Sequence, residues 1–130
     1  MGAWDEKNFG NDSAMDWVNE FEDNPTIELL KNTLQDLVDS DDYIDMDIAS
    51  AGLAAAEIVA ALKGKSSSDL PETISPLIKG ISFVDGLDKL AIEAVNKAMS
   101  ENSELMELWS EGEDGDKWIA LQDDLIKRLV

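Results

Sequence analysis

The sequence contains no cysteine and no histidine. Without cysteine the chain cannot form a disulfide or hold an iron–sulfur cluster, and without histidine it lacks an imidazole base and the usual ligands of a zinc site. Basic residues are also scarce, because 10 Lys and Arg stand against 29 Asp and Glu and give a formal net charge of −19. Such a charge disfavours a phosphate backbone or an anionic membrane leaflet as a ligand. We therefore expect neither nucleic-acid binding nor membrane binding.

Familiar catalytic and cofactor motifs are missing as well. The chain has no GxSxG, SxxK, GxxxxGK[ST] or GxGxxG pattern, which rules out the commonest nucleophile and phosphate-binding loops. Paired carboxylates can perform acid–base chemistry or hydrolyse glycosides. Among 29 acidic residues, however, some pairs must lie close together by chance, so a pair of neighbouring carboxylates is weak evidence for catalysis in this chain. We predict a protein that is not an enzyme and that uses no cofactor and no metal.

Targeting signals are equally hard to find. The opening residues, MGAWDEKNFG, contain one lysine and no apolar run, unlike a secretory signal, and Glu6 stands where a myristoylation signal needs Ser or Thr. The most apolar stretch, residues 48–62, is shorter than the roughly 20 residues that a bilayer requires and contains Glu57. We expect a cytoplasmic protein in which this stretch is a core helix.

The apolar content is sufficient for one folded domain. The 130 residues are 44% hydrophobic and include 4 Trp and 3 Phe, enough for one compact core. We predict a single acidic helical domain over residues 1–130, monomeric or weakly dimeric. Because no segment alternates as a strand does and helical spacing recurs throughout, the expected fold is an all-α bundle of six or seven helices.

Apolar periodicity and capping residues place most of these helices. The first two helices are expected over about 12–22 and about 25–38, the second with Asn24 as cap and Pro25 in its first turn. Longer helices are expected over 45–64 and from Gly86 through Met99. A short helix capped by Asn102 or Ser103 follows, and the last helix is expected from Trp118 to Leu129. Residues 70–80 contain Pro71 and Pro76, which predict a kinked helix or two short ones. The helix ending at Gly64 is rich in alanine and contains Gly52, so we expect it to be central and closely approached by its neighbours.

Residues at both ends of the chain resemble one bacterial family. The opening carries MGAW, Phe9, Asn11-Asp12, Ala14 and Asp16-Trp17, and the closing segment carries SELMELW at residues 103–109. Together with the alanine-rich middle helix, these motifs are similar to those of the domain of unknown function 4259 family along the whole chain. Asp5 and Gly10 depart from the family pattern, and both lie in the first loop. The resemblance implies a helical domain and assigns no catalytic or binding residues.

The segment DSDDYIDMD, residues 39–47, holds five carboxylates and therefore raises the possibility of a calcium site. An EF-hand loop that started at Asp39 would need Asp or Asn, Gly and Glu at its fifth, sixth and twelfth places, where Tyr43, Ile44 and Ser50 stand. A start at Asp45 fails in the same way. We interpret the segment as a solvated loop whose charge favours the N-terminus of the next helix.

Negative charge is concentrated at the two ends of the chain. Residues 1–47 hold 14 acidic and 2 basic residues, residues 48–100 hold 6 and 5, and residues 101–130 hold 9 and 3. If the outer segments share one side of the bundle, their field would speed encounter with a basic protein. The candidate partner-binding residues are Asp36, Asp39, Asp41, Asp42, Asp45 and Asp47.

These observations favour a protein-binding module, such as an inhibitor or immunity protein for a basic, nuclease-like partner. Three alternatives stay open: a nucleic-acid mimic, a metal-dependent enzyme that uses carboxylates, and an acidic surface that serves only solubility. Trp17, Trp109 and Trp118 share helical stripes with aliphatic residues, so we expect them in the core. Trp4 precedes the first helix and either seals the bundle or serves as an exposed anchor for a partner.

Overall fold

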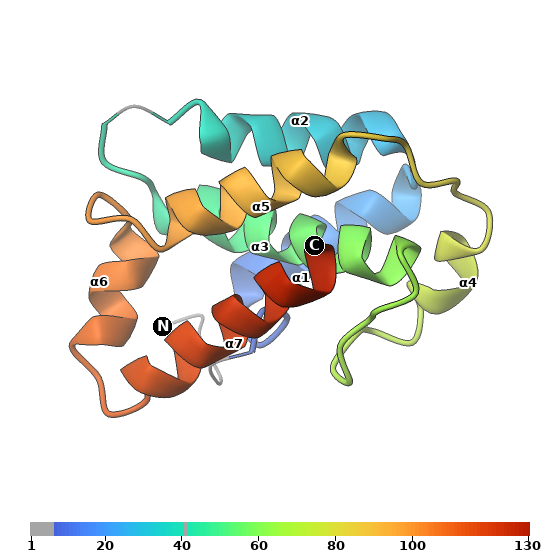
Figure 1. Ribbon diagram of the computed structural model, residues 1–130. Coiled ribbons are helices and arrows are strands. Elements are labelled where there is room, and N and C mark those ends of the chain that lie inside the picture. Colours follow the sequence, from blue (N-terminus) through green and yellow to red (C-terminus); the bar gives the residue numbers. More distant parts are fainter. Residues whose placement is uncertain (1–6, 41) are drawn as a thin grey trace.

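The computed structural model describes residues 7–40 and 42–130, which form a bundle of helices (Figure 1). Seven helices lie in this part of the chain: α1 (Asp12–Asp23), α2 (Ile27–Val38), α3 (Met46–Leu62), α4 (Ser75–Ile78), α5 (Leu87–Ala98), α6 (Glu104–Ser110) and α7 (Gly115–Leu129). Within the same residues the strand-like pairing is limited to one isolated parallel bridge, between Ile44 and Ser103. The predicted all-α fold is confirmed.

The alanine-rich helix α3 is the centre of the bundle. Eleven of its seventeen residues are buried, and it packs against α1, α2, α5, α6 and α7. In Figure 1, α2 lies above α3, α5 crosses in front of it, α1 runs behind it and α7 lies below. A Cβ atom added to Gly52 would collide with the side chain of Leu37 on α2, so the missing side chain lets these two helices approach. The predicted central position and close approach are both confirmed.

The outer helices bury one face each, as their spacing predicts. In α1 the Asn11 side chain caps the helix by accepting a bond of 2.8 Å from the Ala14 backbone amide. The rings of Trp17 and Phe21 stack with centroids 5.5 Å apart, and the Trp17 indole donates a hydrogen bond of 2.9 Å to the Thr33 hydroxyl on α2. Both rings belong to the buried face of α1, and the hydrogen bond from Trp17 to Thr33 joins that face to α2.

Two predicted helix starts are wrong. Helix α7 begins at Gly115, three residues before Trp118. Helix α2 begins at Ile27 and is capped by Thr26, whose hydroxyl accepts a bond of 3.2 Å from the Leu29 amide. Asn24 instead ends α1, where its backbone amide donates to the last turn, and its carbonyl accepts from the Thr26 amide at 2.9 Å rather than from an amide of α2. Thr26 caps α2 in the same way that Asn24 would, because either side chain offers an oxygen to the first-turn amides, which have no partner within the helix.

The segment over residues 70–80 forms a single short helix, α4, rather than a kinked helix or two short ones. Pro76 lies in its first turn, where its missing N–H costs nothing, and Pro71 starts a turn closed by a bond of 3.0 Å from the Ile74 amide. The predicted left-handed residue after α3 is confirmed, since Gly64 has φ of +82°.

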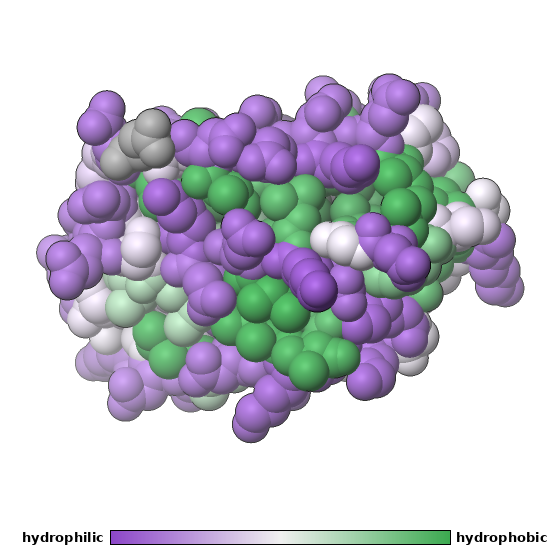
Figure 2. All heavy atoms as spheres, turned by 45° about the horizontal axis from the view of Figure 1, so that its top comes forward, coloured by the Kyte–Doolittle hydropathy of each residue, from purple (hydrophilic) through white to green (hydrophobic). Residues whose placement is uncertain are grey.

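The surface is predominantly polar. Figure 2 shows hydrophilic side chains covering most of one face of the molecule, with apolar patches between them. In the described part of the chain, no helix combines the length and the apolar character that spanning a membrane would take.

Candidate functional site

The acidic loop, residues 39–47, of which the structure describes all but residue 41, contacts the start of α6 through Ile44. The Ile44 amide donates to the Asn102 carbonyl at 2.8 Å, and the Ile44 carbonyl accepts from the Glu104 amide at 3.0 Å. The Ile44 side chain is fully buried and anchors the loop in the core. Two backbone bonds and one buried side chain therefore join segments that lie about sixty residues apart in the sequence.

Two carboxylates of α6 accept hydrogen bonds from groups in or beside the loop. Glu104 Oε1 accepts a bond of 2.9 Å from the Met46 amide at the start of α3. The Tyr43 hydroxyl donates a bond of 3.1 Å to Glu107 Oε2. We use the name acidic face for the described carboxylates of these segments and of the adjoining end of α2, which are Asp36, Asp39, Asp42, Asp45, Asp47, Glu104 and Glu107. It combines the end of α2, the acidic loop and the start of α6.

Five of the six predicted site residues belong to the described part of the chain, and all five are exposed. The sixth, Asp41, lies outside the described residues. Two of the five also have local structural roles: Asp45 caps α3 by accepting from the Asp47 amide at 2.7 Å, and Asp47 accepts from the Ser13 hydroxyl at the start of α1. The predicted helix-capping role of the loop is confirmed at Asp45.

The sequence pattern did not identify Tyr43, the aromatic residue beside the acidic face, as a site residue. Tyr43 is 56% exposed, and Ile48 nearby on α3 is 38% exposed. Partial desolvation, followed by the hydrogen bond and negative charge of Glu107, raises the pKa of Tyr43 above its ordinary value. The available signal was the position of the chain's single tyrosine inside its densest run of aspartates.

The predicted tryptophan positions are mostly confirmed. Trp17 and Trp118 are 6% and 2% exposed and belong to the core. Trp109 is half-buried and packs against the edge of the core. Trp4 lies outside the described residues.

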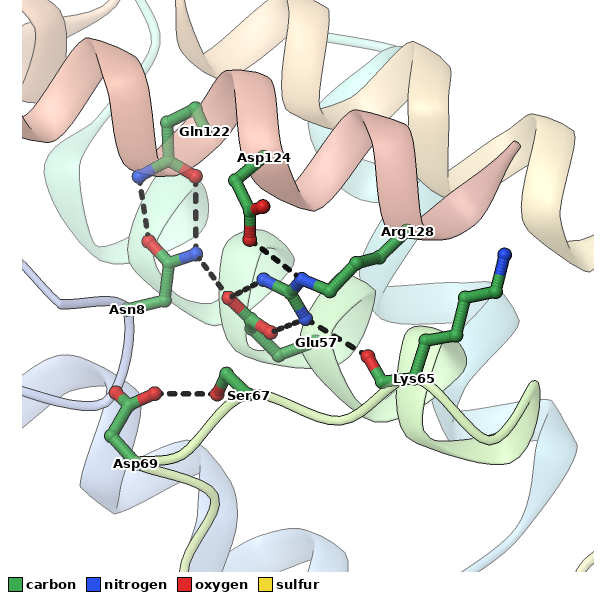
Figure 3. A network of polar contacts seen from close by, with 8 residues as sticks. All are labelled: Asn8, Glu57, Lys65, Ser67, Asp69, Gln122, Asp124 and Arg128. Carbon is green, nitrogen blue, oxygen red and sulfur yellow. Dashed lines mark hydrogen bonds and ion pairs between the residues drawn. The ribbon is translucent and has the colours of Figure 1, made fainter.

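A second polar group, the buried cluster, links the chain's N-terminal segment to α3 and α7 (Figure 3). Asn8 and Gln122 exchange two hydrogen bonds of 3.0 and 2.8 Å, and the Asn8 amide also donates to Glu57 Oε2 at 2.9 Å. Arg128 donates to both carboxylate oxygens of Glu57, at 2.8 and 3.2 Å. The Glu57 side chain is only 1% exposed, so this ion pair replaces the water that the carboxylate lost on folding.

Arg128 connects the buried cluster to the surface. Its guanidinium also donates to Asp124 at 2.8 Å and to the Lys65 carbonyl at 3.1 Å. Burial opposes the positive charge, but the carboxylates of Glu57 and Asp124 outweigh burial and raise the pKa of Arg128 above its ordinary value. A hollow of about 320 Å³ opens beside the pair, and Ser67 and Asp69 lie on its rim.

The hydrogen bonds of the buried cluster occupy its polar groups. Glu57 and Arg128 neutralise each other, and the Asn8 and Gln122 amides satisfy one another. The cluster therefore has a structural role: its polar groups are already paired with one another, and they join the N-terminal segment to α3 and α7. Among residues 7–40 and 42–130, no group of three or more carboxylates is arranged to hold a metal ion.

Comparison with known proteins gives one match. No curated protein and no solved structure matches the chain significantly. The family model described as Domain of unknown function (DUF4259) matches residues 2–120, which is most of the chain and includes both motifs that carried the resemblance. This protein therefore belongs to the DUF4259 family.

Proposed function

We propose that this protein is a non-catalytic binding module whose acidic face docks on a basic protein partner, as an inhibitor or immunity protein does on a nuclease. The observation that carries the proposal is the acidic face itself, where Asp45, Glu104 and Glu107 lie close to the exposed Tyr43. A field of one sign accelerates encounter with a partner of opposite charge, and an exposed aromatic ring offers area that binding can bury.

The uneven distribution of charge favours a protein partner over mimicry of nucleic acid. A general mimic needs charges spaced like phosphates over much of its surface. Residues 48–100 hold 6 acidic and 5 basic residues, so the middle third of the chain is almost neutral. The charge is instead supplied by the two outer segments, which meet where Ile44 pairs with Ser103.

The experiment is affinity capture of the tagged protein from its host's lysate at low and high salt, with mass spectrometry of the retained proteins. The test variant carries Asp36→Asn, Asp39→Asn and Asp42→Asn, which neutralise exposed carboxylates of the acidic face. The matched control neutralises three exposed carboxylates elsewhere, with Glu20→Gln, Glu93→Gln and Asp123→Asn. Both variants have the same net charge.

We expect one basic protein in near-equal amount, released by salt because salt screens the encounter. The acidic-face variant should retain less of it than the control variant does. Retention of nothing, or of many abundant proteins equally by both variants, would overturn the proposal. Displacement of DNA from an unrelated DNA-binding protein would favour the nucleic-acid mimic instead.

A further inference from the structure

A small cavity of about 20 Å³ lies where the N-terminal segment meets α3, α6 and α7. Leu53 on α3, Leu105 on α6 and Trp118 on α7 line its apolar part. These three residues are 1%, 4% and 2% exposed, so this part of the cavity belongs to the core. Trp109 also lines the cavity and is half-buried. The cavity therefore reaches from the edge of α6 into the interior of the bundle.

The side chain of Ser50 on α3 places a hydroxyl group in this apolar part. Ser50 is 2% exposed and lines the cavity. Among residues 7–40 and 42–130, its hydroxyl has no hydrogen-bond partner. Ser103, which is also buried, differs in this respect, because its hydroxyl oxygen accepts from the Met106 amide at 3.2 Å. A buried hydroxyl without a partner costs free energy, so native proteins rarely leave one in that state. Ser50 therefore needs a partner that is not a protein group.

The start of α1 supplies further polar groups to the same cavity, through Asn11 and Ser13. The Asn11 side-chain oxygen accepts from the Ala14 amide at 2.8 Å, which leaves the NH₂ group of Asn11 as a donor. The Ser13 hydroxyl donates its hydrogen to Asp47, which leaves its oxygen as an acceptor. A donor and an acceptor from α1 thus line the same small space as the hydroxyl from α3.

The size of the cavity determines the class of ligand. One internal water molecule requires about 10–15 Å³ of such volume and two to four polar partners, and this cavity meets both conditions. Organic ligands occupy pockets of about 300 Å³ or more, so the cavity is far too small for them. Lys7 also lines the cavity, and its positive charge disfavours a metal cation there.

We propose that this cavity binds one internal water molecule, held by the Ser50 hydroxyl and by the side chains at the start of α1. Asn11 supplies a donor to this water, Ser13 supplies an acceptor, and the Ser50 hydroxyl can act as either. The inference goes beyond the proposed function and does not depend on a partner protein.

The bound water joins α1 to α3 at the point where the acidic loop leads into α3. Ser13 lines the cavity and also donates to Asp47 in the first turn of α3. Met46 lines the cavity as well, and its backbone amide donates to Glu104 on α6. An internal water that satisfies polar groups of two helices is part of the structure, because its removal leaves those groups unpaired.

The test is ¹⁷O magnetic relaxation dispersion of the full chain in water. The amplitude of this signal counts the water molecules that stay bound for longer than the protein takes to tumble. The test variant is Ser50→Ala, which removes the hydroxyl and introduces the commonest residue of α3, so the helix is retained. The matched control is Ser103→Ala, which removes a buried hydroxyl that already has a protein partner. Circular dichroism checks that both variants keep the helix content of the natural chain.

We expect the amplitude to fall by about one water molecule in Ser50→Ala and to stay unchanged in Ser103→Ala. Rotating-frame Overhauser cross-peaks from water to the methyl groups of Leu53 and Leu105 should disappear in the same variant. An equal amplitude in the natural chain and in Ser50→Ala would overturn the proposal. An equal loss in both variants would also overturn it, since a general loosening of the fold would then release the water.

Discussion

The Tyr43 hydroxyl donates a hydrogen bond of 3.1 Å to Glu107 Oε2, joining the acidic loop to α6 across 64 residues of sequence. The backbone bonds of Ile44 to Asn102 and Glu104 lie directly beside it and hold the same two segments together. An exposed aromatic ring that is held in place before binding loses less conformational entropy when a partner covers it. The contact therefore supports a role for Tyr43 at an interface.

Titration of Tyr43 tests this contact in the isolated protein. Because desolvation and Glu107 raise its pKa, the tyrosinate absorbance should appear with a midpoint above 10.0, the ordinary value. The folded state then favours the neutral phenol, so the associated stability is complete below pH 10 and is lost as pH rises through the folded-state pKa. The chain contains 1 Tyr, which makes the spectroscopic signal unambiguous.

The control for this titration is Glu107→Gln, which keeps a hydrogen-bond acceptor and removes the charge. Its midpoint should move back toward that of an exposed tyrosine. A midpoint that is the same in both proteins would contradict the contact between Tyr43 and Glu107.

Gly52 provides a test of the packing between α2 and α3. A Cβ atom at this position would strike the Leu37 side chain, and overpacking of a core typically costs about 1–3 kcal/mol. We therefore expect Gly52→Ala to lower the free energy of unfolding by that amount in urea denaturation.

The double variant Gly52→Ala with Leu37→Ala identifies the cause. Leu37→Ala alone opens a cavity, because Leu37 is fully buried, and should cost about 2–5 kcal/mol. If the two side chains compete for one space, the double variant loses less stability than the sum of the single variants. Additive losses would place the strain elsewhere.

Local pattern was sufficient to predict most of the helices. The helices carry their own periodicity and caps, and Gly52 in an alanine-rich run indicated a close approach before the neighbour, Leu37, was known. The start of α2 was misplaced because Asn24 and Thr26 are both good caps two residues apart. Choosing between them requires knowing where α1 ends.

The long-range contacts of the site could not be read from local pattern. The acidic loop and α6 meet through a bridge at Ile44 and Ser103, which no periodicity encodes. Glu57 stands in an apolar helix, and its partner Arg128 is 71 residues away among ordinary charged residues of α7. Only the tertiary packing of α3 on α7 brings that pair together.

The concentration of carboxylates predicts an unusual response to salt. A net charge of −19 repels itself in the compact state, and the acidic face concentrates this repulsion. Added sodium chloride should therefore raise the melting temperature, measured by circular dichroism. In the variant Asp36→Lys with Asp42→Lys the rise should be smaller, whereas a melting temperature that falls with salt would show that attractive ion pairs dominate.

The buried cluster yields the sharpest prediction about stability, because its two charged members differ in exposure. The Glu57 side chain is 1% exposed and that of Arg128 is 16% exposed. Arg128→Met leaves the carboxylate buried without its counter-charge and should cost about 3–5 kcal/mol of unfolding free energy. Glu57→Gln should cost less, since the amide oxygen still accepts from Asn8 and the guanidinium keeps Asp124.

The combined variant Glu57→Gln with Arg128→Met separates the cost of leaving one buried charge unpaired from the cost of losing the ion pair itself. It no longer contains a buried charge, so it should be more stable than Arg128→Met alone, even though it carries one more substitution. Lys117→Met serves as the control, because its pair with Asp114 is 68% and 50% exposed and should contribute less than about 1 kcal/mol. Equal losses for Arg128→Met and Lys117→Met in urea denaturation would mean that water reaches Glu57, and the cluster would then be a surface ion pair rather than a tie between α3 and α7.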